Sequence, residues 1–131
     1  MANSSRQPIK KVLVVDDVES IRLIAKIGLE NKTQWQVVLV SSGQEALDVA
    51  GKEIPDVILL DVMMPGMDGK ETLIRLRENS VTASIPVIFV TAKVQDHELE
   101  NYSDLNVHGV ITKPFDPMEL SAEVERILNE K

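Results

Sequence analysis

The chain has 131 residues, a length typical of one domain, and 44% of them are apolar, which is enough for a hydrophobic core. The absence of cysteine excludes disulfide bonds, and a net charge of −7 disfavours nucleic acid as a partner because an acidic surface repels polyphosphate. No apolar run reaches the roughly 18 residues of a membrane helix, and the N-terminus has no apolar core of a signal peptide. We therefore expect a cytoplasmic protein with no membrane partner.

Five short apolar runs rich in valine and isoleucine predict strands buried on both faces, because polar and apolar residues do not alternate in them. In chain order these runs are Val12–Val15, Val37–Val40, Val57–Leu60, Pro86–Val90 and Gly109–Ile111. Segments with helical periodicity lie between and after them. Their expected core residues are Ile21, Ile24, Ala25 and Gly28; Ala46, Leu47 and Ala50; Leu73, Ile74 and Leu76; and Leu120, Val124, Ile127 and Leu128, while Val94–Leu105 is mostly polar and gives the weakest helical pattern.

This alternation of strands and helices predicts an α/β fold with a five-stranded parallel sheet, helices on both faces and right-handed crossovers. The common strand order for such a flavodoxin-like, doubly wound sheet is 2-1-3-4-5. We expect an N-terminal tail at residues 1–10 and one domain at residues 11–131. Ligands of such sheets lie beyond the carboxyl ends of the strands, where the strand order reverses.

Polar side chains follow four of the five predicted strands at that edge. They are Asp16 and Asp17, Asp61, Thr91 and Lys113. Two carboxylates about 4 Å apart repel each other by about 4 kcal/mol at an effective dielectric constant near 20. Three converging carboxylates therefore predict a bound cation, a raised pKa, or both.

Oxygen ligands without histidine or cysteine favour magnesium, manganese or calcium. Magnesium leaves coordination positions for phosphate oxygens, which suits phosphoryl transfer. In such a site Asp61 can act as the nucleophile and form an aspartyl-phosphate. Lys113 and the metal would hold the phosphoryl oxygens, and the Thr91 hydroxyl would donate a hydrogen bond to one of them.

Four motifs in order resemble the receiver domains of two-component response regulators, including the single-domain chemotaxis regulator, over residues 11–130. They are VLVVDD (Val12–Asp17), VILLDVMMPGMDG (Val57–Gly69), VIFVTA (Val87–Ala92) and TKPF (Thr112–Phe115). The resemblance implies that Asp61 is the phosphoacceptor, and that Asp17, Asp61 and the Met63 carbonyl ligate Mg²⁺ directly while Asp16 acts through water. It also implies that Thr91 is the switch hydroxyl, that Lys113 binds the phosphoryl group, and that the Lys113–Pro114 peptide is cis.

The resemblance further implies a phosphoprotein of two-component signal transduction rather than an enzyme with a separate substrate. A sensor histidine kinase or a histidine phosphotransfer protein would phosphorylate it, and an unknown output protein would respond. Because the chain ends with the last predicted helix, we expect output by contact. Val110 departs from the family pattern, which usually has an aromatic ring there, so ring-based switching is not expected. Met63 and Lys93 stand at positions similar to those that tune dephosphorylation in the family, although both also fit plain surface residues.

Three other functions fit the pattern less well. A magnesium-dependent phosphohydrolase with an aspartyl nucleophile would need a second Asp as general acid, where this chain has Met63. A flavin-binding protein would need a phosphate-binding loop after the first strand, where Asp16 and Asp17 would repel phosphate. A purely structural module would not need all five polar residues. His97 and His108 have no partner ligand at helical or hairpin spacing and are not expected to bind metal.

Overall fold

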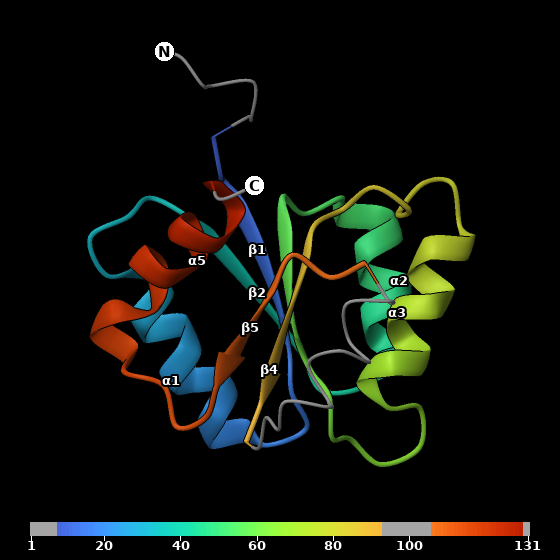
Figure 1. Cartoon of the computed structure of the whole chain (residues 1–131), viewed down its shortest axis with the longest axis horizontal. Coiled ribbons are helices and arrows are strands. Elements are labelled where there is room, and N and C mark those ends of the chain that lie inside the picture. Colours follow the sequence, from blue (N-terminus) through green and yellow to red (C-terminus); the bar gives the residue numbers. More distant parts are fainter. Residues whose placement is uncertain (1–7, 93–105, 130–131) are drawn as a thin grey trace.

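The computed structural model describes residues 8–92 and 106–129 (Figure 1). In this part of the chain, five parallel strands form one sheet in the order β2-β1-β3-β4-β5, which confirms the predicted fold class. The strands are β1 (Lys11–Val15), β2 (Gln36–Val40), β3 (Val57–Asp61), β4 (Val87–Thr91) and β5 (Gly109–Thr112). The helices are α1 (Glu19–Glu30), α2 (Gly43–Glu53), α3 (Gly69–Glu78), the short 3-10 helix η1 (Pro117–Glu119) and α5 (Leu120–Asn129).

Helices cover both faces of the sheet, with α1 and α5 on one side and α2 and α3 on the other (Figure 1). Alternate strand residues feed two hydrophobic cores: Val14 and Leu59 pack toward α1 and α5, whereas Leu13 and Leu60 pack toward α2 and α3. This two-sided burial explains why the strands are continuously apolar. Among the described residues, no helix is both long and apolar enough to cross a membrane.

The predicted core face is correct for α5 but partly wrong for α1 and α3. Leu120, Val124, Ile127 and Leu128 are buried, while Ile24 is 40% exposed and Ile74 is 46% exposed. In α1, Gly28 packs so tightly on η1 that a Cβ atom there would lie 2.3 Å from the carbonyl oxygen of Pro117. That contact turns the small-residue face of α1 inward and leaves Ile24 partly outside.

The helix expected at Val94–Leu105 lies outside the described residues, as do Lys93 and His97. Trp35 is buried in the core on the α1 and α5 side of the sheet. His108 is exposed, and its backbone N–H donates to the carbonyl of Val87 at the amino end of β4, which is the opposite edge of the sheet from the acidic residues.

Candidate functional site

Three carboxylates converge where β1 and β3 end, as the sequence predicts. Asp16, Asp17 and Asp61 each offer one oxygen, and these oxygens all lie within 4.8 Å of one another. Asp16 and Asp61 are only 2% and 3% exposed, whereas Asp17 is exposed. The site therefore has a buried acidic floor and one carboxylate at its mouth.

Lys113 places one positive charge in this cluster. Its Nζ lies 2.9 Å from Oδ2 of Asp16 and 3.4 Å from Oδ2 of Asp61. One ammonium against three carboxylates leaves two negative charges uncompensated among these four groups. The donor set is all oxygen, so these residues fit a hard divalent cation such as Mg²⁺.

The site raises the pKa of both Asp61 and Lys113. Burial raises the pKa of the Asp61 carboxyl above 3.8, and repulsion from Asp16 raises it further, against the opposing effect of Lys113. Burial alone would lower the pKa of Lys113, but its interactions with Asp16 and Asp61 outweigh burial and raise that pKa. Two carboxylates thus stabilise the charged form of Lys113, whereas burial and Asp16 disfavour the ionised form of Asp61.

Asp16 is held at four points. Its backbone N–H donates to the carbonyl of Val40 at 3.2 Å, which continues the pairing of β1 with β2. Its Oδ1 accepts from the N–H of Val18 at 2.9 Å, and Oδ2 faces Lys113. Its carbonyl accepts a 2.7 Å hydrogen bond from Nη1 of Arg22 in α1. The sequence alone does not point to Arg22, because its spacing from Asp16 does not reveal where a long side chain ends.

The loop after β3 closes tightly around Asp61. The N–H of Met63 donates to Oδ1 of Asp61 at 3.2 Å, and the Met63 side chain is 74% exposed. The N–H of Gly69 donates to the carbonyl of Val62 at 3.0 Å, which brings the start of α3 against the strand end. A Cβ atom at residue 69 would lie 2.4 Å from the carbonyl oxygen of Asp61, so only glycine fits there.

Thr91 is the last residue of β4, and Lys113 directly follows β5, the strand beside it. Thr91 is 2% exposed and pairs with Thr112 in the register of β4 and β5. The N–H of Lys113 donates to the carbonyl of Thr91 at 2.8 Å, so the two site residues are joined through the backbone. The Lys113–Pro114 peptide is cis, as the resemblance implies.

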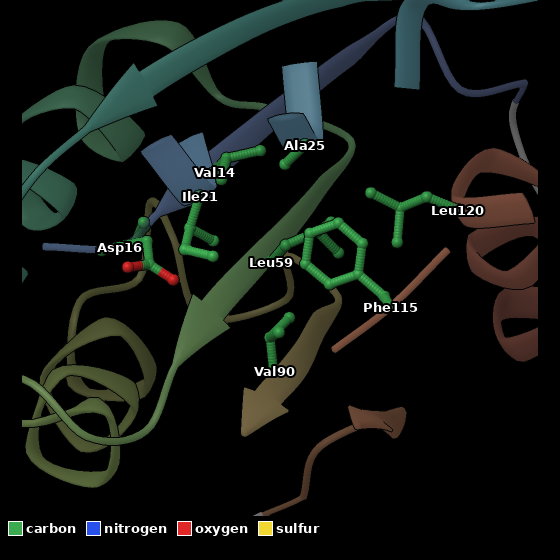
Figure 2. Close-up of a pocket in the computed structure, with 9 residues that line it drawn as sticks. Val14, Asp16, Ile21, Ala25, Leu59, Val90, Phe115 and Leu120 are labelled. Carbon is green, nitrogen blue, oxygen red and sulfur yellow. The ribbon is translucent and has the colours of Figure 1, made fainter. Parts of the chain in front are cut away.

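Phe115 anchors the segment that carries Lys113. Its ring points into a small apolar pocket next to Asp16, shown in Figure 2. The other residues lining the pocket are Val14, Val15, Ile21, Ala25, Leu59, Val90 and Leu120. The pocket belongs to the core on the α1 and α5 side, and we regard it as support for the site rather than as a second site.

Comparisons with known proteins agree with this geometry. Residues 12–125 match the response regulator receiver domain. The chain belongs to this family. The receiver domain is 40% identical over 119 residues to the alkaline phosphatase synthesis transcriptional regulatory protein PhoP of Bacillus subtilis, covering 91% of this chain and 48% of that protein. It is 37% identical over 119 residues to the response regulator PleD of Caulobacter vibrioides, covering 89% of this chain and 26% of that protein.

Among solved structures, the chemotaxis response regulator CheY4 of Vibrio cholerae superposes on the receiver domain with a TM-score of 0.83 at 32% identity. That match covers 92% of this chain and 99% of the CheY4 chain. By contrast, the receiver domain spans only 48% of the length of PhoP and 26% of the length of PleD. The fold and the two-component signalling family are therefore established, and phosphorylation on an aspartate is implied by the family.

Proposed function

We propose that this receiver domain accepts a phosphoryl group on Asp61 from a sensor histidine kinase or a histidine phosphotransfer protein. In this proposal Mg²⁺ binds at Asp16, Asp17, Asp61 and the backbone carbonyl of Met63, with Asp16 acting through water. The observation that carries the proposal is the position of Asp61, a buried carboxylate within 3.4 Å of Lys113 in a cluster with unbalanced negative charge. Such a cluster favours a bound cation. Without that cation, the carboxylates would repel the negative charge of the incoming phosphoryl group.

In the transfer step, a carboxylate oxygen of Asp61 attacks the phosphorus of a phosphohistidine. A P–O bond forms, the P–N bond breaks, and its electron pair stays on the imidazole nitrogen. A Mg²⁺ ion held by Asp16, Asp17 and Asp61 would supply the positive charge that offsets the charge of the carboxylates and the phosphoryl oxygens. The Lys113 ammonium then moves from the carboxylates to the phosphoryl group, and the Thr91 hydroxyl donates a hydrogen bond to it.

Exposed apolar side chains beside the site suit a transient protein donor. Val18 is 44% exposed and Met63 is 74% exposed, and they follow Asp17 and Asp61 closely in the chain. A donor that presents its histidine to Asp61 must cover this edge of the sheet. Burying these side chains on contact would favour the encounter and exclude water from the transfer step.

Phosphorylation would change the contacts of the domain with an output protein, so the receiver acts as a switch and catalyses only its own phosphorylation and dephosphorylation. We place it in the cytoplasm, where ATP-dependent kinases operate. Its net charge of −7 supports protein partners rather than nucleic acid or an anionic membrane surface.

The test is phosphorylation by acetyl phosphate, followed by intact mass spectrometry. We expect one added phosphate that requires Mg²⁺ and is abolished by Asp61→Asn or by a chelator. Asp48→Asn is the matched control, because Asp48 is an exposed residue of α2 and should leave labelling unchanged. Undiminished labelling of Asp61→Asn would disprove the assignment of the acceptor, and labelling in chelator would disprove the metal requirement.

A further inference from the structure

Arg22 connects α1 to the acidic loop that precedes it. Its backbone N–H donates to the carbonyl of Val18 at 3.1 Å, within the first turn of the helix. Its side chain turns back past that turn, and Nη1 donates to the carbonyl oxygen of Asp16 at 2.7 Å. The guanidinium thus binds the backbone of the acidic loop rather than a carboxylate of the cluster.

That carbonyl belongs to the peptide group that joins Asp16 to Asp17. Because a peptide group is planar, a hydrogen bond that fixes its carbonyl also fixes the direction in which the chain enters Asp17. Asp17 needs this constraint, since it is exposed and no hydrogen bond to its carboxylate occurs within residues 8–92 and 106–129. Asp16, in contrast, is already held by Val40, Val18 and Lys113.

The charge of Arg22 also acts on the turn between β2 and α2. Glu45 of α2 accepts from the N–H of Ser41 at 2.7 Å and from its hydroxyl at 2.8 Å. These two hydrogen bonds lower the pKa of Glu45, and the nearby charge of Arg22 lowers it further. Arg22 therefore interacts electrostatically with Glu45, while its side-chain hydrogen bond goes to the Asp16 carbonyl.

We infer that Arg22 is a positioning residue for the proposed metal site, and that it acts by fixing the peptide between Asp16 and Asp17 so that the Asp17 carboxylate faces the other two. This inference rests on the proposed function, because it concerns the binding of Mg²⁺. Arg22 itself touches neither the metal nor the phosphoryl group.

The sign of the effect on Mg²⁺ affinity distinguishes positioning from simple electrostatics. A positive charge near an acidic site repels a cation, so removing it would strengthen Mg²⁺ binding if charge were its only effect. Removing a group that orients a ligand weakens binding, commonly by 10- to 100-fold for residues just outside the coordination sphere. The two explanations therefore predict opposite changes.

The experiment is an NMR titration of the full chain with MgCl₂, which follows the backbone amides of Asp17, Val18 and Met63. We expect Arg22→Ala to weaken Mg²⁺ binding by about tenfold and Arg22→Lys, which keeps a donor, to recover part of the loss. The amides of Asp17 and Val18 should also shift in metal-free Arg22→Ala. Lys26→Ala is the matched control. It removes a positive charge one turn further along α1, from a side chain that pairs with Glu30, and it should change neither readout.

Equal or tighter Mg²⁺ binding by Arg22→Ala would overturn the inference and leave the proposed function intact. If the parent chain binds no Mg²⁺, both the proposed metal site and the role of Arg22 fail. The NMR spectrum itself reports whether each variant folds. Should Arg22→Ala unfold, Arg22→Met, which keeps a long side chain without a hydrogen-bond donor or a charge, carries the same expectation and the same contradicting outcome.

Discussion

The Lys113 ammonium lies closer to Asp16 than to Asp61, the proposed phosphoacceptor: its Nζ donates a 2.9 Å hydrogen bond to Oδ2 of Asp16. Its distance to Asp61 is 3.4 Å, so Lys113 is shared between the two carboxylates. The ammonium therefore balances two buried carboxylates at once. Its release toward a phosphoryl group would leave Asp16 without this partner unless a metal ion compensates.

The first prediction follows from this shared contact. Lys113→Ala should lower the free energy of unfolding of the metal-free domain by about 2 kcal/mol, because two buried carboxylates lose a charged partner. The same change should tighten Mg²⁺ binding, since the cation no longer competes with an ammonium. Urea unfolding in chelator and a Mg²⁺ titration measure the two effects. Lys52→Ala, on the exposed surface of α2, is the control, and equal stability of the two variants would refute the role of Lys113 in the charge balance.

The second prediction concerns Asp61 and pH in the absence of metal. Since the folded state raises the pKa of Asp61 above 3.8, the folded protein holds this proton to higher pH than the unfolded chain does. The contribution of Asp61 to stability is therefore favourable in acid and is lost as pH rises from 3.8 through the raised pKa. Asp61→Asn should be more stable than the parent at neutral pH, and this difference in stability should vanish below pH 3.8. Thermal unfolding of both proteins in chelator across this range checks the sign, and a parent that is the more stable one at neutral pH contradicts it.

The third prediction tests the close approach of α3 to Asp61. Gly69→Ala should cost about 1–3 kcal/mol, because its Cβ would collide with backbone atoms of Asp61 and Val62 that cannot rotate away. Gly51 offers a matched control within the same fold, because a Cβ there meets nothing within 4 Å. Gly51→Ala should instead stabilise the domain by roughly 0.5–1 kcal/mol, since Gly51 lies inside helix α2. Chemical denaturation gives both values, and equal effects of the two changes would rule out the steric explanation.

The fourth prediction concerns Phe115 as the anchor of the Lys113 segment. Phe115→Ala should destabilise the domain by about 2–4 kcal/mol and slow phosphorylation by acetyl phosphate at saturating Mg²⁺, because Lys113 loses its fixed position. Phe115→Leu keeps an apolar side chain in the pocket and should retain most of both properties. If Phe115→Ala phosphorylates as fast as the parent, Phe115 serves the core alone.

The fold and the acidic cluster could be predicted because they depend on local patterns. Buried strands appear as apolar runs, and parallel topology brings the residue after each strand to one edge. The exposure of Ile24 could not be predicted, since α1 offers more apolar residues than one core face can hold and the contact of Gly28 with η1 decides which of them face inward. The contact of Arg22 with the Asp16 carbonyl was also out of reach, because a flexible side chain with several donors can end at many acceptors.

The last prediction concerns how a phosphoryl signal leaves the site. Val110 is partly buried, pairs with Phe89 across β4 and β5, and packs against the core on the α2 and α3 side. A valine has one stiff side-chain torsion, so it cannot leave or fill a pocket the size of an aromatic ring. A ligand shifts a two-state equilibrium only through its different affinities for the two states. We therefore expect the position of Thr91, rather than that of Val110, to differ between the phosphorylated and unphosphorylated states.

Beryllofluoride with Mg²⁺, used as a phosphoryl mimic, should therefore shift the backbone amides of Thr91 and Ala92 strongly and that of Val110 only slightly. The amides of residues 93–105, which lie outside the described part of the chain, should shift with Thr91. Thr91→Ala should remove most of this response, whereas Thr33→Ala, on the α1–β2 loop, should preserve it. A large two-state rearrangement centred on Val110, with Thr91 and Ala92 unmoved, would show that the signal takes another route.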